Sequence, residues 1–162
     1  MKKPLRALII EDSEFDAVLL VNHLRLGQYD VAWRRVDTAE AMSRALAEQP
    51  WDIVFSDHQM PQFSAPEALE LLQRTGLDLP FIIVSGGIGE ATAVALMKAG
   101  AHDFLTKGQL GRLVPATERE LRDAANRAAR RQAEQQMREN EMRYRLLWHY
   151  SPDAILMADS AG

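Results

Sequence analysis

Short apolar runs alternate with amphipathic stretches over the first 110 residues, and this alternation restricts the fold more than any other feature of the sequence. The runs are brief and several are rich in β-branched residues, which predicts strands that are buried on both faces. These predicted strands cover residues 5–10, 31–36, 53–56, 81–84 and 103–105. Helical periodicity fills the intervals, at residues 14–26, 38–48, 65–75 and 90–99, and begins again at residue 112.

Strands that alternate strictly with helices, over short connections, predict a parallel sheet with helices on both faces. Five such units are present in this chain. We therefore expect an α/β fold with a doubly wound, five-stranded parallel sheet. The expected arrangement is flavodoxin-like, with strand order 2-1-3-4-5 and an extended C-terminal helix.

Capping signals support these helix boundaries. Thr38 and Ser64 are expected to cap the second and third helices, and Glu67 completes a possible capping box with Ser64. Three glycines follow helical runs at positions where a positive φ is expected. They are Gly27, Gly76 and Gly100.

The bulk properties of this 162-residue chain exclude several classes of protein. Its net charge of −4 indicates no nucleic-acid surface, and the lack of cysteine excludes disulfides, thiolate catalysis and Cys-ligated zinc. The apolar run near the N-terminus is too short for a signal peptide or a membrane span. We therefore expect a cytoplasmic protein that binds neither nucleic acid nor membrane.

A charged stretch without glycine or proline, residues 118–145, follows the last predicted strand. Acid-to-base pairs four residues apart recur along it, such as Glu134 with Arg138 and Glu141 with Arg145, and such pairs support a helix. Its apolar stripe is narrow and rich in alanine, whereas a strong coiled-coil seam carries Leu or Ile. Two interpretations stay open: a solvated linker helix, or a helix that dimerises.

Polar and charged side chains stand where the predicted strands end. Glu11 and Asp12 follow the first strand, Asp57 the third, Ser85 the fourth and Lys107 the fifth. Ligands of doubly wound sheets bind at this edge, so we expect these groups to converge. Crowded carboxylates repel one another, and a divalent cation with hard oxygen ligands relieves the repulsion. Mg²⁺ fits best, because it is satisfied by one or two carboxylates, a carbonyl, waters and a phosphate oxygen.

One carboxylate then remains free as a nucleophile, as in aspartyl-phosphate chemistry. Phosphoryl transfer requires positioning and charge stabilisation of the equatorial oxygens. The metal, the Lys107 ammonium and the Ser85 hydroxyl supply that stabilisation from three directions. We therefore identify Asp57 as the candidate phosphoacceptor.

The sequence resembles the receiver domain of response regulators over roughly residues 4–125. Four motifs carry the resemblance, in order and at the ends of the corresponding strands. They are Leu8-Ile9-Ile10-Glu11-Asp12-Ser13, Ile53-Val54-Phe55-Ser56-Asp57 with Met60-Pro61, Ile83-Val84-Ser85-Gly86, and Ala99 to Lys107. The resemblance implies that a histidine kinase or phosphotransfer protein phosphorylates Asp57. It also implies that Glu11, Asp12, Asp57 and the backbone carbonyl of Gln59 hold Mg²⁺.

The resemblance further implies a switch. Lys107 is expected to contact the phosphoryl group, Ser85 to move toward it, and Phe104 to turn inward when the hydroxyl moves. The surface formed by the fourth helix, fifth strand and fifth helix (the 4-5-5 face) then changes, and a phosphoryl group biases such two-state equilibria by about 1–3 kcal/mol. The implied readout runs through the C-terminal helix, with a homodimer formed by that helix or by the 4-5-5 face.

The chain departs from the family pattern in two loops. Gly108 stands where the family usually has proline, often after a cis bond, so we expect a trans bond or stored strain there. Gly86 and Gly87 follow Ser85, and this pair makes the loop more mobile and leaves no side chain to shield the phosphate. His58, beside the acceptor, is expected to tune the phosphate lifetime together with Gln59 and this glycine pair.

The C-terminal residues resemble the opening helix and first strand of a PAS sensory domain. The matching segments are Arg143-Tyr144-Arg145-Leu146-Leu147 and Ser151 to Asp159. We therefore expect a receiver domain at 1–125, a charged signalling helix at 126–142, and a truncated start of a PAS domain at 143–162. A lone first strand has no partner edge, so it is expected to be disordered, re-paired or absorbed into the helix.

Two other functions compete with a phosphorylation switch. A pseudo-receiver acts only as an interaction or dimerisation module, and the complete acidic set with Lys107 argues against it. A phosphatase with an Asp nucleophile carries a second Asp two residues on, where this chain has Gln59. We therefore expect a phosphoacceptor rather than an enzyme. The sequence identifies neither the cognate kinase nor the output, which leaves gene regulation, a kinase or a cyclic-dinucleotide enzyme open.

Overall fold

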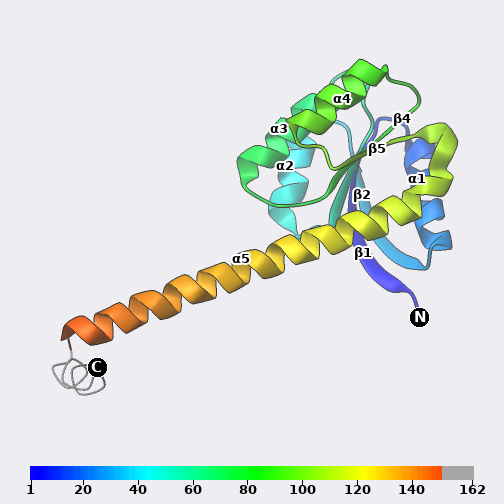
Figure 1. The fold of residues 1–162 in the computed structure, drawn as a ribbon. Helices are drawn as coiled ribbons and strands as arrows, with labels where there is room; N and C mark the ends of the chain where they lie inside the picture. Colours follow the sequence, from blue (N-terminus) through cyan, green and yellow to red (C-terminus); the bar gives the residue numbers. More distant parts are fainter. Residues whose placement is uncertain (151–162) are drawn as a thin grey trace. The chain divides into compact units, whose positions relative to one another are not determined.

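The computed structural model describes residues 1–150, and within that range five strands form one parallel sheet of order β2-β1-β3-β4-β5 (Figure 1). The strands are β1 (Lys3–Ile10), β2 (Tyr29–Val36), β3 (Ile53–Ser56), β4 (Phe81–Ser85) and β5 (Asp103–Thr106). The predicted α/β class and strand order are therefore confirmed. β1 and β2 begin earlier than predicted, because their polar first residues still pair across the ladder, Lys3 with Tyr29.

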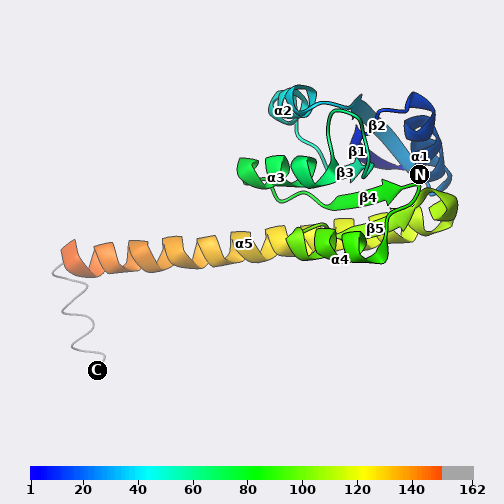
Figure 2. The same ribbon diagram turned by 90° about the horizontal axis from the view of Figure 1, so that it is seen from above.

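Helices connect the strands in the predicted places. They are α1 (Glu14–Leu26), α2 (Ala39–Glu48), α3 (Ala65–Thr75) and α4 (Glu90–Ala99), and α5 (Leu113–Tyr150) follows the sheet. A 3₁₀ turn that the sequence did not predict, η1 (Lys107–Arg112), joins β5 to α5. Figure 2 shows α2 and α3 side by side, in agreement with their mutual contacts.

Alternate residues of each strand enter two separate cores, as the period of two requires. On one face, Leu8 and Ile10 of β1 pack with side chains of α2, α3 and α4. On the other face, Ala7 and Ile9 pack with α1 and with the first turns of α5. Both faces of β1 and β3 are therefore covered by helices. A ligand can reach these strands only at their carboxyl ends, where the polar groups lie.

The capping predictions are confirmed for α2 and α3. The Thr38 hydroxyl accepts a hydrogen bond from the N–H of Ala41, and Ser64 forms a complete capping box with Glu67. Gly76 and Gly100 have positive φ, as predicted. The prediction was wrong for Gly27, whose φ is −82°, while Gln28 takes the left-handed conformation instead.

Close packing gives a different reason for glycine at position 27. A Cβ at Gly27 would lie 2.5 Å from Cγ2 of Val114 on α5. Helix α1 therefore approaches the beginning of α5 so closely that no side chain fits.

Residues Met1–Ala124 form one compact unit, and the part of α5 after Ala124 belongs to a second. Beyond Ala124, i,i+4 ion pairs lie along the helix surface, including Arg145 with Glu141 at 2.7 Å. Within residues 1–150, no helix combines the length and the apolar character that crossing a membrane requires. The expected first PAS strand falls in residues 151–162, outside the described part of the chain.

Candidate functional site

The sheet brings Glu11 and Asp57 side by side at its carboxyl edge. The last residues of β1 and β3, Ile10 and Ser56, are register partners, so the residues that follow them are adjacent. The Asp57 N–H donates to the Ile10 carbonyl at 2.8 Å and extends this pairing by one residue. Carboxylate oxygens of Glu11, Asp12 and Asp57 all lie within 4.8 Å of one another. The predicted convergence of three acids is therefore present.

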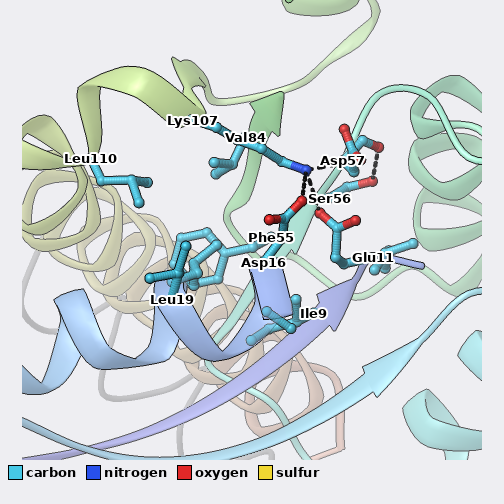
Figure 3. A pocket seen from close by; sticks show the side chains of 13 residues that line it. Ile9, Glu11, Asp16, Leu19, Phe55, Ser56, Asp57, Val84, Lys107 and Leu110 are labelled. Carbon is cyan, nitrogen blue, oxygen red and sulfur yellow. Dashed lines mark hydrogen bonds and ion pairs between the residues drawn. The ribbon is translucent and has the colours of Figure 1, made fainter. Parts of the chain in front are cut away.

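The Lys107 ammonium contacts two acids of this cluster and one further acid (Figure 3). Its Nζ lies 2.9 Å from Glu11 Oε2, 3.2 Å from Asp57 Oδ2 and 2.7 Å from Asp16 Oδ2. An ammonium has three N–H donors, and three carboxylates here take all of them. The predicted neighbours Glu11 and Asp57 are both in contact with the lysine.

Sequence reasoning missed Asp16, the third partner of Lys107. It lies in the first turn of α1, where its N–H is capped by the Ser13 hydroxyl at 3.2 Å. Asp16 does not stand at the end of a predicted strand, where the other site residues were expected. A usable signal existed, because the N-terminus of a helix that follows a parallel strand opens at the same edge of the sheet.

Burial and charge crowding govern the electrostatics of the cluster. Burial raises the pKa of Glu11 to about 7, although hydrogen bonds from Lys107 and the Ser13 N–H act in the opposite direction. Burial alone would lower the pKa of Lys107, but hydrogen bonds to Asp16 and Glu11 outweigh it and raise that pKa above its ordinary value. Placing a full negative charge on Glu11 is therefore unfavourable in the metal-free protein.

Short-range hydrogen bonds fix the acceptor carboxylate. The His58 N–H donates to Asp57 Oδ1 at 2.7 Å, while Lys107 contacts Oδ2. The Asp57 side chain is about nine-tenths buried, so this orientation is defined by protein groups rather than by water. The His58 ring nitrogen Nδ1 is buried and has no hydrogen-bond partner among the described residues.

The other predicted site residues differ in their exposure. Ser85 is buried at the end of β4, beside Thr106 of β5. Phe104 is half-buried and packs against the core on the α2–α4 face. Gly86 and Gly87 are exposed, and a Cβ at either would meet no atom within 4 Å. Gln59 is exposed in the loop after β3. Their functional roles stay predictions.

The loop after Lys107 has the trans bond that was one of the two expected outcomes. The Lys107–Gly108 peptide bond is trans. Lys107 begins η1, and the non-helical backbone of Gln109 interrupts that turn.

The acidic residues fit a magnesium ion by their chemistry. Glu11, Asp12 and Asp57 offer only hard oxygen ligands, close enough together to share one ion. Burial raises the pKa of Glu11 to about 7, so a cation bound beside it would favour its charged form. This acidic triad is typical of the Mg²⁺ site of receiver domains.

Comparison with known proteins agrees with this geometry. Residues 7–118 match the response regulator receiver domain family. The chain is 30% identical over 138 residues to the response regulator protein PilR of Pseudomonas aeruginosa, covering 85% of this chain but only 29% of PilR. It is 29% identical over 102 residues to the chemotaxis protein CheY of Thermotoga maritima, covering 63% of this chain and 84% of CheY.

A solved structure also shares the fold. It is the signal receiver domain of a Luxo repressor protein from Vibrio parahaemolyticus, with a TM-score of 0.69 and 24% identity. The match covers 78% of this chain and 96% of that domain. Together with the acidic cluster and its lysine, these matches lead to one conclusion: the chain belongs to the response regulator receiver domain family, whose members are phosphoacceptor modules and not enzymes.

Proposed function

We propose that this chain is the phosphoacceptor module of a two-component phosphorelay, in which a histidine kinase or phosphotransfer protein phosphorylates Asp57 in a Mg²⁺-dependent reaction. One observation carries the proposal. The Asp57 carboxylate lies within 4.8 Å of two further carboxylates and 3.2 Å from an ammonium group, at the ligand-binding edge of the sheet. A structural aspartate at a strand end has no need of such companions.

In the proposed transfer, an oxygen of Asp57 bonds to phosphorus while the P–N bond of the donor phosphohistidine breaks. The leaving imidazole nitrogen keeps the electron pair of that bond. The His58 N–H holds one oxygen of the acceptor, and Lys107 stabilises charge on the phosphoryl oxygens. Glu11, Asp12, Asp57 and the Gln59 carbonyl would hold Mg²⁺, which would supply positive charge to offset the negative charge of the transferred group.

The new phosphoryl group is the proposed trigger of a conformational change. It adds nearly two negative charges and strong acceptor oxygens beside Lys107 and close to Ser85. Both side chains gain hydrogen bonds to it only when their loops rearrange, so the phosphate favours one of two states. Phe104 lies in a surface hollow with Val94 and Met97 of α4, where an inward turn of the ring would change the 4-5-5 face.

The proposed output leaves through α5. This helix begins beside the site, after η1, and continues without interruption to Tyr150. We assign residues 1–125 to the receiver domain, 126–142 to a charged signalling helix, and 143–162 to the start of a PAS domain in a cytoplasmic protein. The proposed homodimer forms through that helix or through the 4-5-5 face. Reading the coding sequence beyond residue 162 tests the PAS assignment, and sedimentation of phosphorylated and unphosphorylated protein tests the dimer.

The alternative is a pseudo-receiver that acts only through protein contacts. It is tested by incubating the protein with Mg²⁺ and acetyl phosphate, followed by intact-mass analysis. We expect one phosphoryl adduct on the wild type, none on Asp57→Asn, and none when the metal is chelated. Asp30→Asn is the matched control, because Asp30 is exposed at the opposite end of the sheet, and it keeps the adduct. A wild type without an adduct favours the pseudo-receiver.

A further inference from the structure

Asp16 accepts a hydrogen bond from the Lys107 ammonium, and no step of the proposed transfer requires this bond. Its Oδ2 lies closer to Nζ, at 2.7 Å, than the oxygens of Glu11 or Asp57 do. Figure 3 shows the Asp16 carboxylate reaching from α1 toward the lysine. The Ser13 cap on the Asp16 N–H holds the start of α1 in place and with it the origin of this side chain.

The three partners of Lys107 differ in how easily they can be released. The Glu11 side chain is only 6% exposed, so water cannot replace the lysine there. The Asp57 carboxylate is the group that accepts the phosphoryl group, so its contact with Lys107 belongs to the reaction itself. The Asp16 side chain is 32% exposed, and water can therefore solvate its carboxylate once the lysine leaves.

A phosphoryl group on Asp57 places its oxygens beyond the carboxylate that Lys107 now contacts. The ammonium must shift toward them to donate, and this shift lengthens its bond to Asp16, the partner that solvent can replace. The charge of Asp16 acts in the same direction, because it repels an incoming group that carries nearly two negative charges. Both effects oppose phosphorylation.

We propose that Asp16 is a positioning residue that restrains Lys107 in the unphosphorylated protein, competes with the phosphoryl group for it, and so slows phosphorylation of Asp57. The inference rests on the proposed function and names a regulator of the same site. It predicts that removing the Asp16 carboxylate speeds the phosphorylation of Asp57. If Asp16 instead supported the reaction, its removal would slow phosphorylation.

The test is the rate of adduct formation with Mg²⁺ and acetyl phosphate, followed by intact mass. Asp16→Asn is expected to raise the rate about threefold to tenfold, the range for a partly exposed ion pair worth on the order of 1 kcal/mol. Asp16→Ser, which also lacks the charge, is expected to do the same, while Asp16→Glu stays near the wild-type rate. Glu14→Gln is the matched control, since Glu14 is an exposed acid in the same helical turn, and it leaves the rate unchanged.

A double mutant separates the restraint from simple repulsion. In a Lys107→Met background, Asp16→Asn is expected to give a clearly smaller acceleration than in the wild type, because the restraint is already gone and only the repulsion of the incoming group is left to remove. An equal acceleration in both backgrounds would overturn the restraint, and so would an unchanged or slower Asp16→Asn protein. If the wild type forms no adduct at all, the proposed function fails and this inference fails with it. If the wild type reacts and Asp16→Asn matches it, only this inference fails.

Discussion

Glu11→Gln is expected to remove most of the pH dependence that the acidic cluster gives to stability. The ordinary pKa of this carboxyl is 4.5, and burial raises it to about 7 in the folded protein. The folded state therefore holds a proton that the unfolded state releases between these values. Wild-type stability should fall as the pH rises from about 4.5 to about 7, with the full loss present above pH 7.

The size of this effect follows from the shift. A difference between 4.5 and about 7, at about 1.4 kcal/mol per pH unit, corresponds to about 3 kcal/mol. Gln resembles the protonated acid at all pH values and keeps an oxygen for Lys107. The variant should therefore match the wild type near pH 4 and exceed its stability by about 3 kcal/mol at pH 8.

Urea unfolding at a series of pH values from 4 to 8, in the presence of a chelator, measures this difference. The difference between the free energies of unfolding of the two proteins, taken at each pH, cancels the contributions of the histidines and of all remaining acids. Glu14→Gln is the control, and as an exposed surface substitution it should change stability by no more than about 0.5 kcal/mol at either extreme. Parallel curves for the wild type and Glu11→Gln would show that Glu11 keeps an ordinary pKa and would refute the reasoning.

Three further substitutions test packing, capping and the site. Gly27→Ala should lower the free energy of unfolding by about 1–3 kcal/mol, because its Cβ meets Val114, and Val114→Ala in the same protein should recover much of the loss in urea titrations. Ser64→Ala breaks a capping box and should cost about 1 kcal/mol, which thermal unfolding detects as a lower midpoint. Lys107→Met should slow adduct formation from acetyl phosphate about 100-fold, while equal rates would exclude Lys107 from the transfer.

The strand and helix positions could be predicted because local signals and the global fold agree. Apolar runs such as residues 53–56 have only one place in a doubly wound sheet, between two layers of helices. The capping box at Ser64 marks the start of α3 within one residue. Positions of Glu11 and Asp57 at one edge followed from the parallel topology, since both come directly after paired strand ends.

The features that the sequence did not predict depend on contacts between distant segments. Gly27 directly follows a helix, which predicts a left-handed cap. Its lack of a side chain instead makes room for Val114, which is 87 positions away in the sequence. Asp16 meets Lys107 across a sequence separation of 91 residues. The 3₁₀ turn η1 contains two glycines, which predict a loop, and its helical pattern is interrupted at Gln109.

The identity of the phosphorylated residue tests the central claim most directly. An aspartyl phosphate formed with Mg²⁺ and acetyl phosphate can be trapped by borohydride, which reduces the acyl phosphate to the alcohol, and located by peptide mass spectrometry. Reduction at Asp57, and at no other acid of the cluster, is the predicted result. Reduction at Glu11 or Asp12 instead, or no reduced residue in a protein that carries the adduct, would contradict the assignment of Asp57 as the phosphoacceptor.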